Sequence, residues 1–147
     1  MDILKYAIKS KLIEGKKHIF DSIRRKYVFL TPEELVRQKF IRFLIEEKGY
    51  PKSLIKVEGG HNYGPMKKRT DILCYNNLGT PVLLIECKSF KVQLSQNTLE
   101  QLSVYNQSIK AEVIGITNGI SHFFYQVDYE KRKLNNLETL PDFKNIV

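Results

Sequence analysis

Two strand-like stretches separated by a turn stand out in the hydrophobic pattern of this chain. Residues 70–76 are rich in β-forming residues, and residues 82–85 form an unbroken apolar run. Asn77, Gly79 and Pro81 lie between them and are residues typical of turns. The pattern therefore predicts a β-hairpin whose second strand is buried.

If the loop of this hairpin is the four residues 77–80, Asp71 lies opposite Glu86. Facing side chains of an antiparallel pair are about 5 Å apart. The strand period of two places Lys88 on the same face as Glu86. Two facing carboxylates repel each other unless something lies between them, and hard divalent cations bind carboxylate oxygens. This register makes the end of the hairpin a candidate metal site.

Two helices are predicted on either side of this hairpin. The first begins at Thr31-Pro-Glu-Glu34, where Thr31 is a suitable N-cap and Glu34 completes a capping box, and it ends before Gly49. The second covers residues 95–109. Its apolar and aromatic residues recur at helical spacing, namely Leu99, Leu102, Tyr105 and Ile109.

Further strands are predicted at residues 54–57 and 112–117. Asn118-Gly119 is a strong hairpin signal, and residues 121–127 would form the return strand. The helix at 95–109 would then be the right-handed crossover between two parallel strands. The elements predict one α/β domain with a mixed sheet and helices on both of its faces.

The two ends of the chain give weaker patterns. Residues 1–15 have apolar residues near a helical period, so a short helix is expected there, ending at Gly15. The basic stretch 16–30 is expected to be a solvated turn, with a phosphate-contacting arm as the alternative. Residues 129–147 have few apolar anchors and are expected to form a tail or a docking helix.

The composition favours a folded protein that handles nucleic acid. The net charge is +8, which is the electrostatic pattern of nucleic-acid binders. No apolar run is long enough to span a membrane. Cys74 and Cys87 are the only cysteines and are too far apart in this register for a disulfide, so we expect reduced core thiols on the face away from the carboxylates. A cytoplasmic location is the consistent expectation.

Asp71, followed by Glu86-Cys87-Lys88 at the end of an apolar strand, resembles the PD-(D/E)xK nuclease superfamily, although Thr70 replaces the usual proline. A wider set of motifs resembles, in order, the N-terminal nuclease domain of type I restriction enzyme R subunits. The set comprises Thr31–Gln38, Lys68–Ile72, Ile85–Lys88, Gln101–Tyr105 and Ile116–Gly119. This resemblance covers roughly residues 19–127, which leaves 1–18 as an N-terminal helical extension and 128–147 as a C-terminal tail.

The resemblance implies a restriction-endonuclease-like fold and a metal-dependent endonuclease that hydrolyses DNA. It implies that Asp71, Glu86 and the backbone carbonyl of Cys87 hold Mg²⁺, with Mn²⁺ as a substitute. Lys88 would position or help to deprotonate the attacking water. The alternative is a non-cleaving nucleic-acid-binding or interaction subunit of a restriction or repair complex.

The resemblance also implies roles for residues outside this hairpin. An acid on the first helix would assist the metal site, and Glu34 aligns best, with Glu33 its nearest rival. Capping alone is the competing interpretation for Glu34. Gln101 would brace the site and Tyr105, four residues later on the same helix face, would touch the substrate; the competing interpretation is a polar residue beside a core tyrosine.

Two expectations concern the substrate and the partners. The basic cluster Lys67, Lys68 and Arg69 precedes Asp71, and we expect it to contact DNA rather than to be a solvated strand end. The sequence contains no Gly-x-x-x-x-Gly-Lys-Ser/Thr loop, whereas type I R subunits have an ATP-driven motor. The protein would then be either a separate small nuclease or a subunit that uses a motor in trans, so the expected partners are DNA and, in the second case, a separate motor or specificity subunit.

Overall fold

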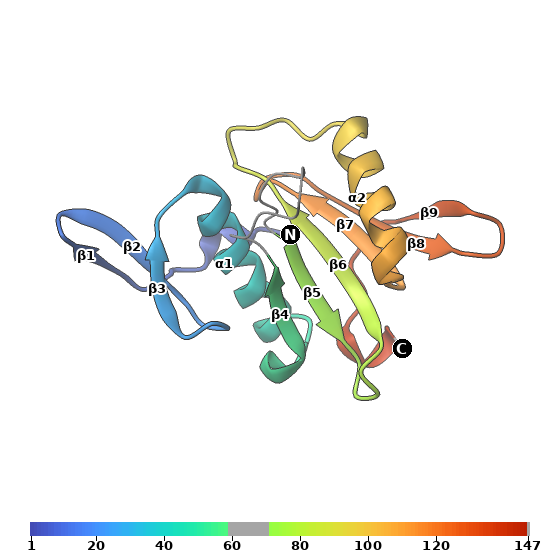
Figure 1. Ribbon diagram of the computed structural model, residues 1–147, viewed down its shortest axis with the longest axis horizontal. Helices are drawn as coiled ribbons and strands as arrows, with labels where there is room; N and C mark the ends of the chain where they lie inside the picture. Colours follow the sequence, from blue (N-terminus) through green and yellow to red (C-terminus); the bar gives the residue numbers. More distant parts are fainter. Residues whose placement is uncertain (59–70, 147) are drawn as a thin grey trace.

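A mixed β-sheet forms the body of the protein (Figure 1). The computed structural model describes residues 1–58 and 71–146. Within these residues the sheet has six strands, of which β6 and β7 are parallel and all other neighbours are antiparallel. Its strands, in spatial order, are β4 (Ile55–Glu58), β5 (Asp71–Tyr75), β6 (Pro81–Cys87), β7 (Val113–Thr117), β8 (His122–Asp128) and β9 (Lys133–Leu137).

Two α-helices, α1 (Pro32–Glu46) and α2 (Gln96–Ile109), cover opposite faces of this sheet. The alternation of side chains along β6 divides the core between them. Ile85 packs with Phe40 of α1, whereas Leu84 packs with Leu102 of α2. The mixed α/β fold with helices on both faces is as predicted, and α2 joins the two parallel strands.

The first helix begins where its capping signals predict, and the second begins within a residue of its predicted start. The hydroxyl of Thr31 accepts a hydrogen bond from the backbone N–H of Glu34 at 3.1 Å. The hydroxyl of Ser95 accepts one from the backbone N–H of Thr98 at 3.3 Å. Each cap satisfies a backbone donor that has no partner within the helix.

The β5–β6 hairpin has the predicted register over most of its length. Asp71 pairs with Glu86, and Cys74 pairs with Leu83. The register shifts between Cys74 and Tyr75, so Tyr75 pairs with Pro81 and not with Val82 as predicted. The extra residue of such a bulge is absorbed next to the turn, and the far end of the hairpin keeps its pairing.

Cys74 and Cys87 are free thiols, buried on the α1 side of the sheet as predicted. Burial alone raises the pKa of the Cys74 thiol well above its ordinary value. Cys74 is therefore a protonated packing group at neutral pH and not a nucleophile.

The N-terminal residues do not form the predicted helical extension. Apart from one short 3-10 turn, η1 (Ile3–Lys5), they form a second, antiparallel sheet. It consists of β1 (Ser10–Ile13), β2 (Lys16–Asp21) and β3 (Lys26–Phe29), so the expected solvated turn at 16–30 is also wrong. The reason lies in the turn between β1 and β2.

Glu14 and Gly15 form the two-residue loop of the β1–β2 hairpin, since Ile13 pairs directly with Lys16. Their φ angles are 51° and 78°. Two consecutive residues with positive φ are typical of the tightest hairpin turns, whose twist matches that of the strands. Gly15 therefore forms part of a hairpin turn and does not end a helix.

The C-terminal residues are not a tail or a docking helix. Lys133–Leu137 form β9, which extends the sheet, and the chain then returns to the core. Leu140 and Ile146 are 1% and 5% exposed and pack beside α1 residues, on either side of a short 3-10 turn, η3 (Phe143–Asn145). The hydroxyl of Tyr50 donates to the backbone carbonyl of Pro141 at 2.9 Å, which fixes this return.

The remaining strands agree with the sequence pattern to within a residue or two. A 3-10 turn, η2 (Lys52–Leu54), leads into β4, and the turn at Asn118-Gly119 joins β7 to β8. Gly115 lies in the middle of β7 because a Cβ there would be only 2.6 Å from a ring carbon of Phe124. Within the described residues, no helix is long and apolar enough to cross a membrane.

Candidate active site

A cleft of about 510 Å³ opens where β6 ends. It lies between this strand end, the first turn of α1 and the end of β3. Its lining contains three acids and three bases within a rim of apolar and hydroxyl side chains. The lining residues are Arg24, Val28, Phe29, Thr31, Glu33, Glu34, Arg37, Glu86, Cys87 and Lys88.

Glu86 is the most buried of the three acids, with only 5% of its surface exposed. It is the penultimate residue of β6, and the strand register places Asp71 of β5 directly opposite. The register that motivated the metal-site hypothesis is therefore present in the sheet. Glu86 also lies next to the parallel strand β7, where its partner is Ile116.

Lys88 follows β6 directly and lines the same cleft. Its backbone N–H donates to the carbonyl of Thr117 at 2.8 Å, which continues the parallel β6–β7 pairing one residue past the end of the strand. This hydrogen bond fixes the backbone from which the half-buried Lys88 side chain reaches into the cleft.

The loop beyond Lys88 is tied to the neighbouring strand end by Asn118, which is 7% exposed. Its side-chain amide donates to the carbonyl of Val92 at 2.7 Å, and its oxygen accepts from the backbone of Ser121 at 2.8 Å. Next to it, Oγ1 of Thr117 lies 2.7 Å from Nδ1 of His122, whose pKa burial lowers to about 4. His122 is therefore neutral at pH 7, and this strand end is held by neutral hydrogen bonds.

Glu34 is engaged by two arginines. Its carboxylate accepts hydrogen bonds from Arg37, one turn later on α1, with the Nε contact at 3.3 Å, and from a guanidinium nitrogen of Arg24 at 3.1 Å. Arg24 also pairs with the buried Asp21 of β2. Glu34 therefore joins α1 to the small sheet, which is a structural role beyond the predicted capping.

Arg37 and the ion pairs of Arg24 were not predicted from the sequence. Arg37 is 1% exposed, which is rare for an arginine unless it is paired. The only signal in the sequence was its spacing of three residues from Glu34 on a predicted helix, which places the two side chains on one face.

The family of the type I restriction enzyme R protein N terminus matches residues 32–141, which is most of the chain. The protein belongs to this family. Membership implies a restriction-related nuclease role. A comparison with curated proteins finds no match.

In this R-protein N-terminal domain, Glu33 is the acid of α1 that remains available to the cleft. It lines the cleft beside Glu34, and among the described residues it makes no ion pair. The sequence motifs alone favour Glu34 over Glu33. The geometry favours Glu33 instead, because the carboxylate of Glu34 is bound by two arginines.

The two glutamates allow a matched test. Glu34→Gln is expected to lower the free energy of unfolding by about 1.5–3 kcal/mol, the usual value of a hydrogen bond to a charged group. Glu33→Gln, one residue away, is expected to change stability by less than about 0.5 kcal/mol and to reduce nuclease activity instead. Urea denaturation of both variants measures the difference. Equal stability of the two variants would contradict the structural role of Glu34.

The structure does not bring the residues predicted on α2 to this cleft. Gln101 is exposed, and Tyr105 is half-buried against the apolar core between α2 and the sheet. Neither lines the cleft. This arrangement favours the competing interpretation, a polar residue beside a core tyrosine. Lys67, Lys68 and Arg69 lie outside the described residues.

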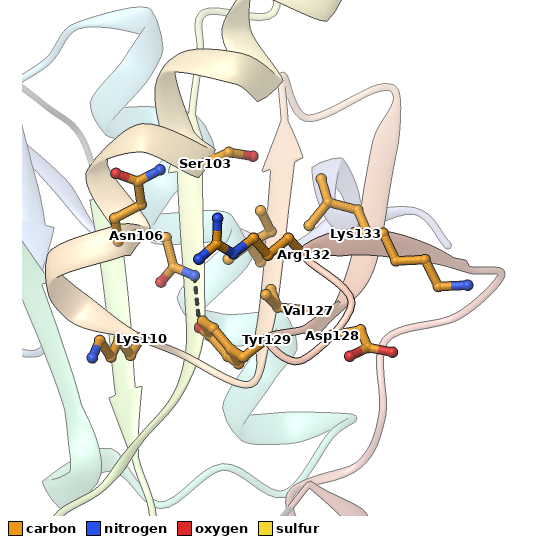
Figure 2. Close-up of a pocket in the computed structure, with 11 residues that line it drawn as sticks. Ser103, Asn106, Lys110, Val127, Asp128, Tyr129, Arg132 and Lys133 are labelled. Atoms are coloured by element: carbon orange, nitrogen blue, oxygen red, sulfur yellow. Dashed lines mark hydrogen bonds between the residues drawn. The ribbon is translucent and has the colours of Figure 1, made fainter.

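A larger cavity, of about 700 Å³, lies at the other end of the sheet, between α2 and the β8–β9 hairpin (Figure 2). It borders Ile114 near the start of β7, whereas Lys88 bonds to Thr117 at the end of that strand. Its central polar groups bond to each other, since Asn106 donates to the hydroxyl of Tyr129 at 3.0 Å. It contains neither Glu86 nor Lys88, so size does not identify the candidate active site here.

The donor chemistry of the cleft suits a hard cation. Glu33 and Glu86, two residues with carboxylate side chains, line it, and Asp71 is paired with Glu86 in the sheet. In residues 1–58 and 71–146, no group of three or more His, Cys, Asp or Glu side chains is gathered to hold a metal. The side chain of Asp71, the other acid expected at this strand end, lies beyond what the structure describes.

Proposed function

We propose that this protein is a metal-dependent endonuclease that hydrolyses phosphodiester bonds of DNA. The observation that carries the proposal is the strand end, where buried Glu86 is paired in register with Asp71 and followed by Lys88 in one cleft. The same residues form the acid–acid–lysine pattern of the nuclease superfamily. Membership in the restriction R-protein N-terminal family supports the same chemistry.

Asp71, Glu86 and the backbone carbonyl of Cys87 would hold Mg²⁺ in this proposal, and Mn²⁺ would substitute for it. A bound divalent cation lowers the pKa of water and stabilises charge on the phosphate and the leaving oxygen. These are oxygen donors, which Mg²⁺ prefers to a thiol such as that of Cys87, which also lines the cleft.

The residues around this site would position the attacking water, accept its proton and stabilise the developing charge. Lys88 offers an ammonium group that can orient the attacking water and offset the negative charge that develops at phosphorus. Glu33 can accept a proton or a hydrogen bond from water at the mouth of the cleft. Arg24 and Arg37 hold Glu34, whereas Glu33 makes no ion pair among the residues that the structure describes.

The family also bears on partners. Type I R proteins imply a complex of several subunits that acts on DNA. We propose DNA as the substrate and the other subunits of a restriction complex, including a motor or specificity subunit, as partners. Gln101 is exposed on α2 and is available to such a partner or to DNA, which keeps a functional role for it as a proposal.

The direct test is incubation of supercoiled plasmid with the protein in Mg²⁺, in Mn²⁺ and in EDTA. Nicked or linear product in either metal, and none in EDTA, is the expected result. Stable binding of DNA without cleavage in both metals would instead favour a non-cleaving nucleic-acid-binding subunit.

The basic cluster that precedes β5 gives a separate prediction. Changing Lys67, Lys68 and Arg69 together to alanine is expected to weaken binding to unrelated DNA sequences alike, because interactions with phosphates carry no sequence information. The slope of log affinity against log salt should fall by about 0.9 for each phosphate that the protein no longer neutralises. A salt titration with an unchanged slope would show that the cluster does not touch DNA.

A further inference from the structure

The small sheet β1–β3 has one face on which aromatic and basic side chains alternate. His18 of β2 pairs with Lys11 on one side and with Phe29 on the other, and Phe20 pairs with Tyr27. Residues two apart on a strand share a face. We call this the aromatic-basic face, and it comprises Lys9, Lys11, Lys16, His18, Phe20, Tyr27 and Phe29.

The aromatic rings of this face form two edge-to-face pairs. The rings of His18 and Phe29 have centroids 5.7 Å apart, and those of Phe20 and Tyr27 are 5.2 Å apart, both edge to face. The ammonium of Lys11 lies 4.2 Å from the centroid of the Tyr27 ring. Phe29 is 54% exposed, an unusual exposure for a phenylalanine in a paired strand.

The opposite face of the same strands anchors the sheet to the body. Ile19 and Asp21 of β2 are 2% and 0% exposed, and Asp21 pairs with Arg24, which reaches Glu34 of α1. Side chains alternate along β2, so burial of this face leaves the aromatic-basic face on the outside. Figure 1 shows the sheet at one end of the molecule, separate from the six-stranded sheet.

The charge on the outer face is not neutralised within the described residues. Lys9, Lys11 and Lys16 are exposed, and none of them makes an ion pair in this part of the chain. Residues 1–30 contain eight of the 24 lysines and arginines but three of the 16 acids. Unpaired cations beside exposed rings match the chemistry of a phosphate backbone that carries unstacked bases.

This face also leads into the candidate active site. Phe29, at the end of β3, lines the cleft that contains Glu86 and Lys88. The sheet lies before residue 32, where the family match begins, so family membership assigns it no role.

We propose that the aromatic-basic face binds a single-stranded segment of nucleic acid and guides it to the cleft. The bases would stack on the ring of Phe29 and its neighbours, and the phosphates would contact Lys11 and Lys16. That the bound nucleic acid is part of the nuclease substrate rests on the proposed nuclease function. The binding itself does not require cleavage.

The test measures fluorescence anisotropy of a labelled single-stranded oligothymidylate with the full chain in EDTA, where cleavage does not interfere. Lys11→Ala with Lys16→Ala removes two charges from the aromatic-basic face. The matched control, Lys17→Ala with Lys26→Ala, removes the same charge from exposed positions on the opposite face of the same strands. Thermal melts of both double variants establish that they are folded.

The first pair is expected to weaken binding at least tenfold and to reduce the salt slope by about 0.7 for each phosphate that is no longer neutralised. The control pair is expected to leave both quantities nearly unchanged. Phe29→Ala should weaken binding roughly fivefold or more without changing the salt slope, because stacking carries no charge. Leu12→Ala, an exposed apolar residue on the opposite face, is its control.

Equal losses of affinity from the two lysine pairs would overturn the proposal and show only diffuse electrostatic attraction. Tighter binding of the wild type to a duplex of the same length would overturn the single-strand specificity. Face-dependent binding in a protein that cuts no plasmid would leave this inference standing while the proposed function fails. Metal-dependent cleavage together with equal affinity losses from the two lysine pairs would support the proposed function and overturn this inference.

Discussion

Lys88→Ala is expected to reduce Mg²⁺-dependent cleavage of plasmid DNA by about 100-fold or more, with the protein still folded. Lys88 lines the cleft together with Glu86, and in the proposed reaction removal of a positioned proton-transfer or charge-stabilising group has effects of this size. Lys88 is only half-buried, and its backbone hydrogen bond to Thr117 does not depend on the side chain. Initial rates of nicking measure the reduction.

Glu86→Gln provides the second half of this experiment. It keeps the shape of a buried side chain and removes its charge, so we expect a comparable loss of metal-dependent activity. Lys110→Ala is a suitable control, because Lys110 borders the distant cavity at the other end of the sheet and is exposed. Cleavage that persists in EDTA, or that is unchanged in Glu86→Gln, would disprove the assignment of this site.

The second large effect concerns stability and not rate. Saturating Mn²⁺, at about 100 times its dissociation constant, is expected to stabilise the wild type by about 2.7 kcal/mol, because a ligand that binds only the native state shifts the unfolding equilibrium by mass action. Asp71→Asn should gain little from the metal. Thermal melts of both proteins, with Mn²⁺ and in EDTA, measure these changes.

The metal-free forms distinguish a metal site from a structural ion pair. Like charges directly opposite in a sheet cost a few tenths to about 1 kcal/mol, so Asp71→Asn should leave stability in EDTA unchanged or slightly higher. A structural pairing of Asp71 with a base such as Lys88 or Arg69 predicts the reverse. A wild-type melting temperature that does not respond to Mn²⁺, with a destabilised Asp71→Asn variant, would disprove the metal-site proposal.

The β5–β6 hairpin was predictable because several independent local signals agree there. Asn77, Gly79 and Pro81 place the turn, and the apolar run of β6 defines a buried strand. The bulge at Tyr75 left no such signal, but it lies next to the turn and did not disturb the pairing of Asp71 with Glu86.

The N-terminal sheet was not predictable from the same kind of pattern. The spacing of its apolar residues fits a helix as well as a strand, and Glu14 is an unusual residue for a positive φ angle. β9, with the sequence Lys-Leu-Asn-Asn-Leu, is an edge strand whose polar composition resembles a loop. Each segment is a strand because it pairs with a neighbouring strand of the chain, which its own residue pattern does not indicate.

In the candidate site too, local contacts were predictable from the sequence and long-range contacts were not. The predicted capping box is confirmed in its first half, in which the Thr31 hydroxyl accepts from the backbone N–H of Glu34. The carboxylate of Glu34, however, is directed by Arg24, from a segment whose fold the sequence did not reveal. Long-range ion pairs depend on where two backbone elements meet, and that information is not contained in either element alone.

The two-residue turn at Glu14 and Gly15 allows the length of the β1–β2 hairpin to vary. It closes a hairpin formed by contiguous residues, so lengthening its strands adds about 3.3 Å per residue without altering the six-stranded sheet. Insertion of one residue in each strand would turn the side chains between the two insertions to the opposite face. Variation in the length of this hairpin among related proteins should therefore occur in steps of two residues per strand, and each step would lengthen the molecule's footprint on its ligand.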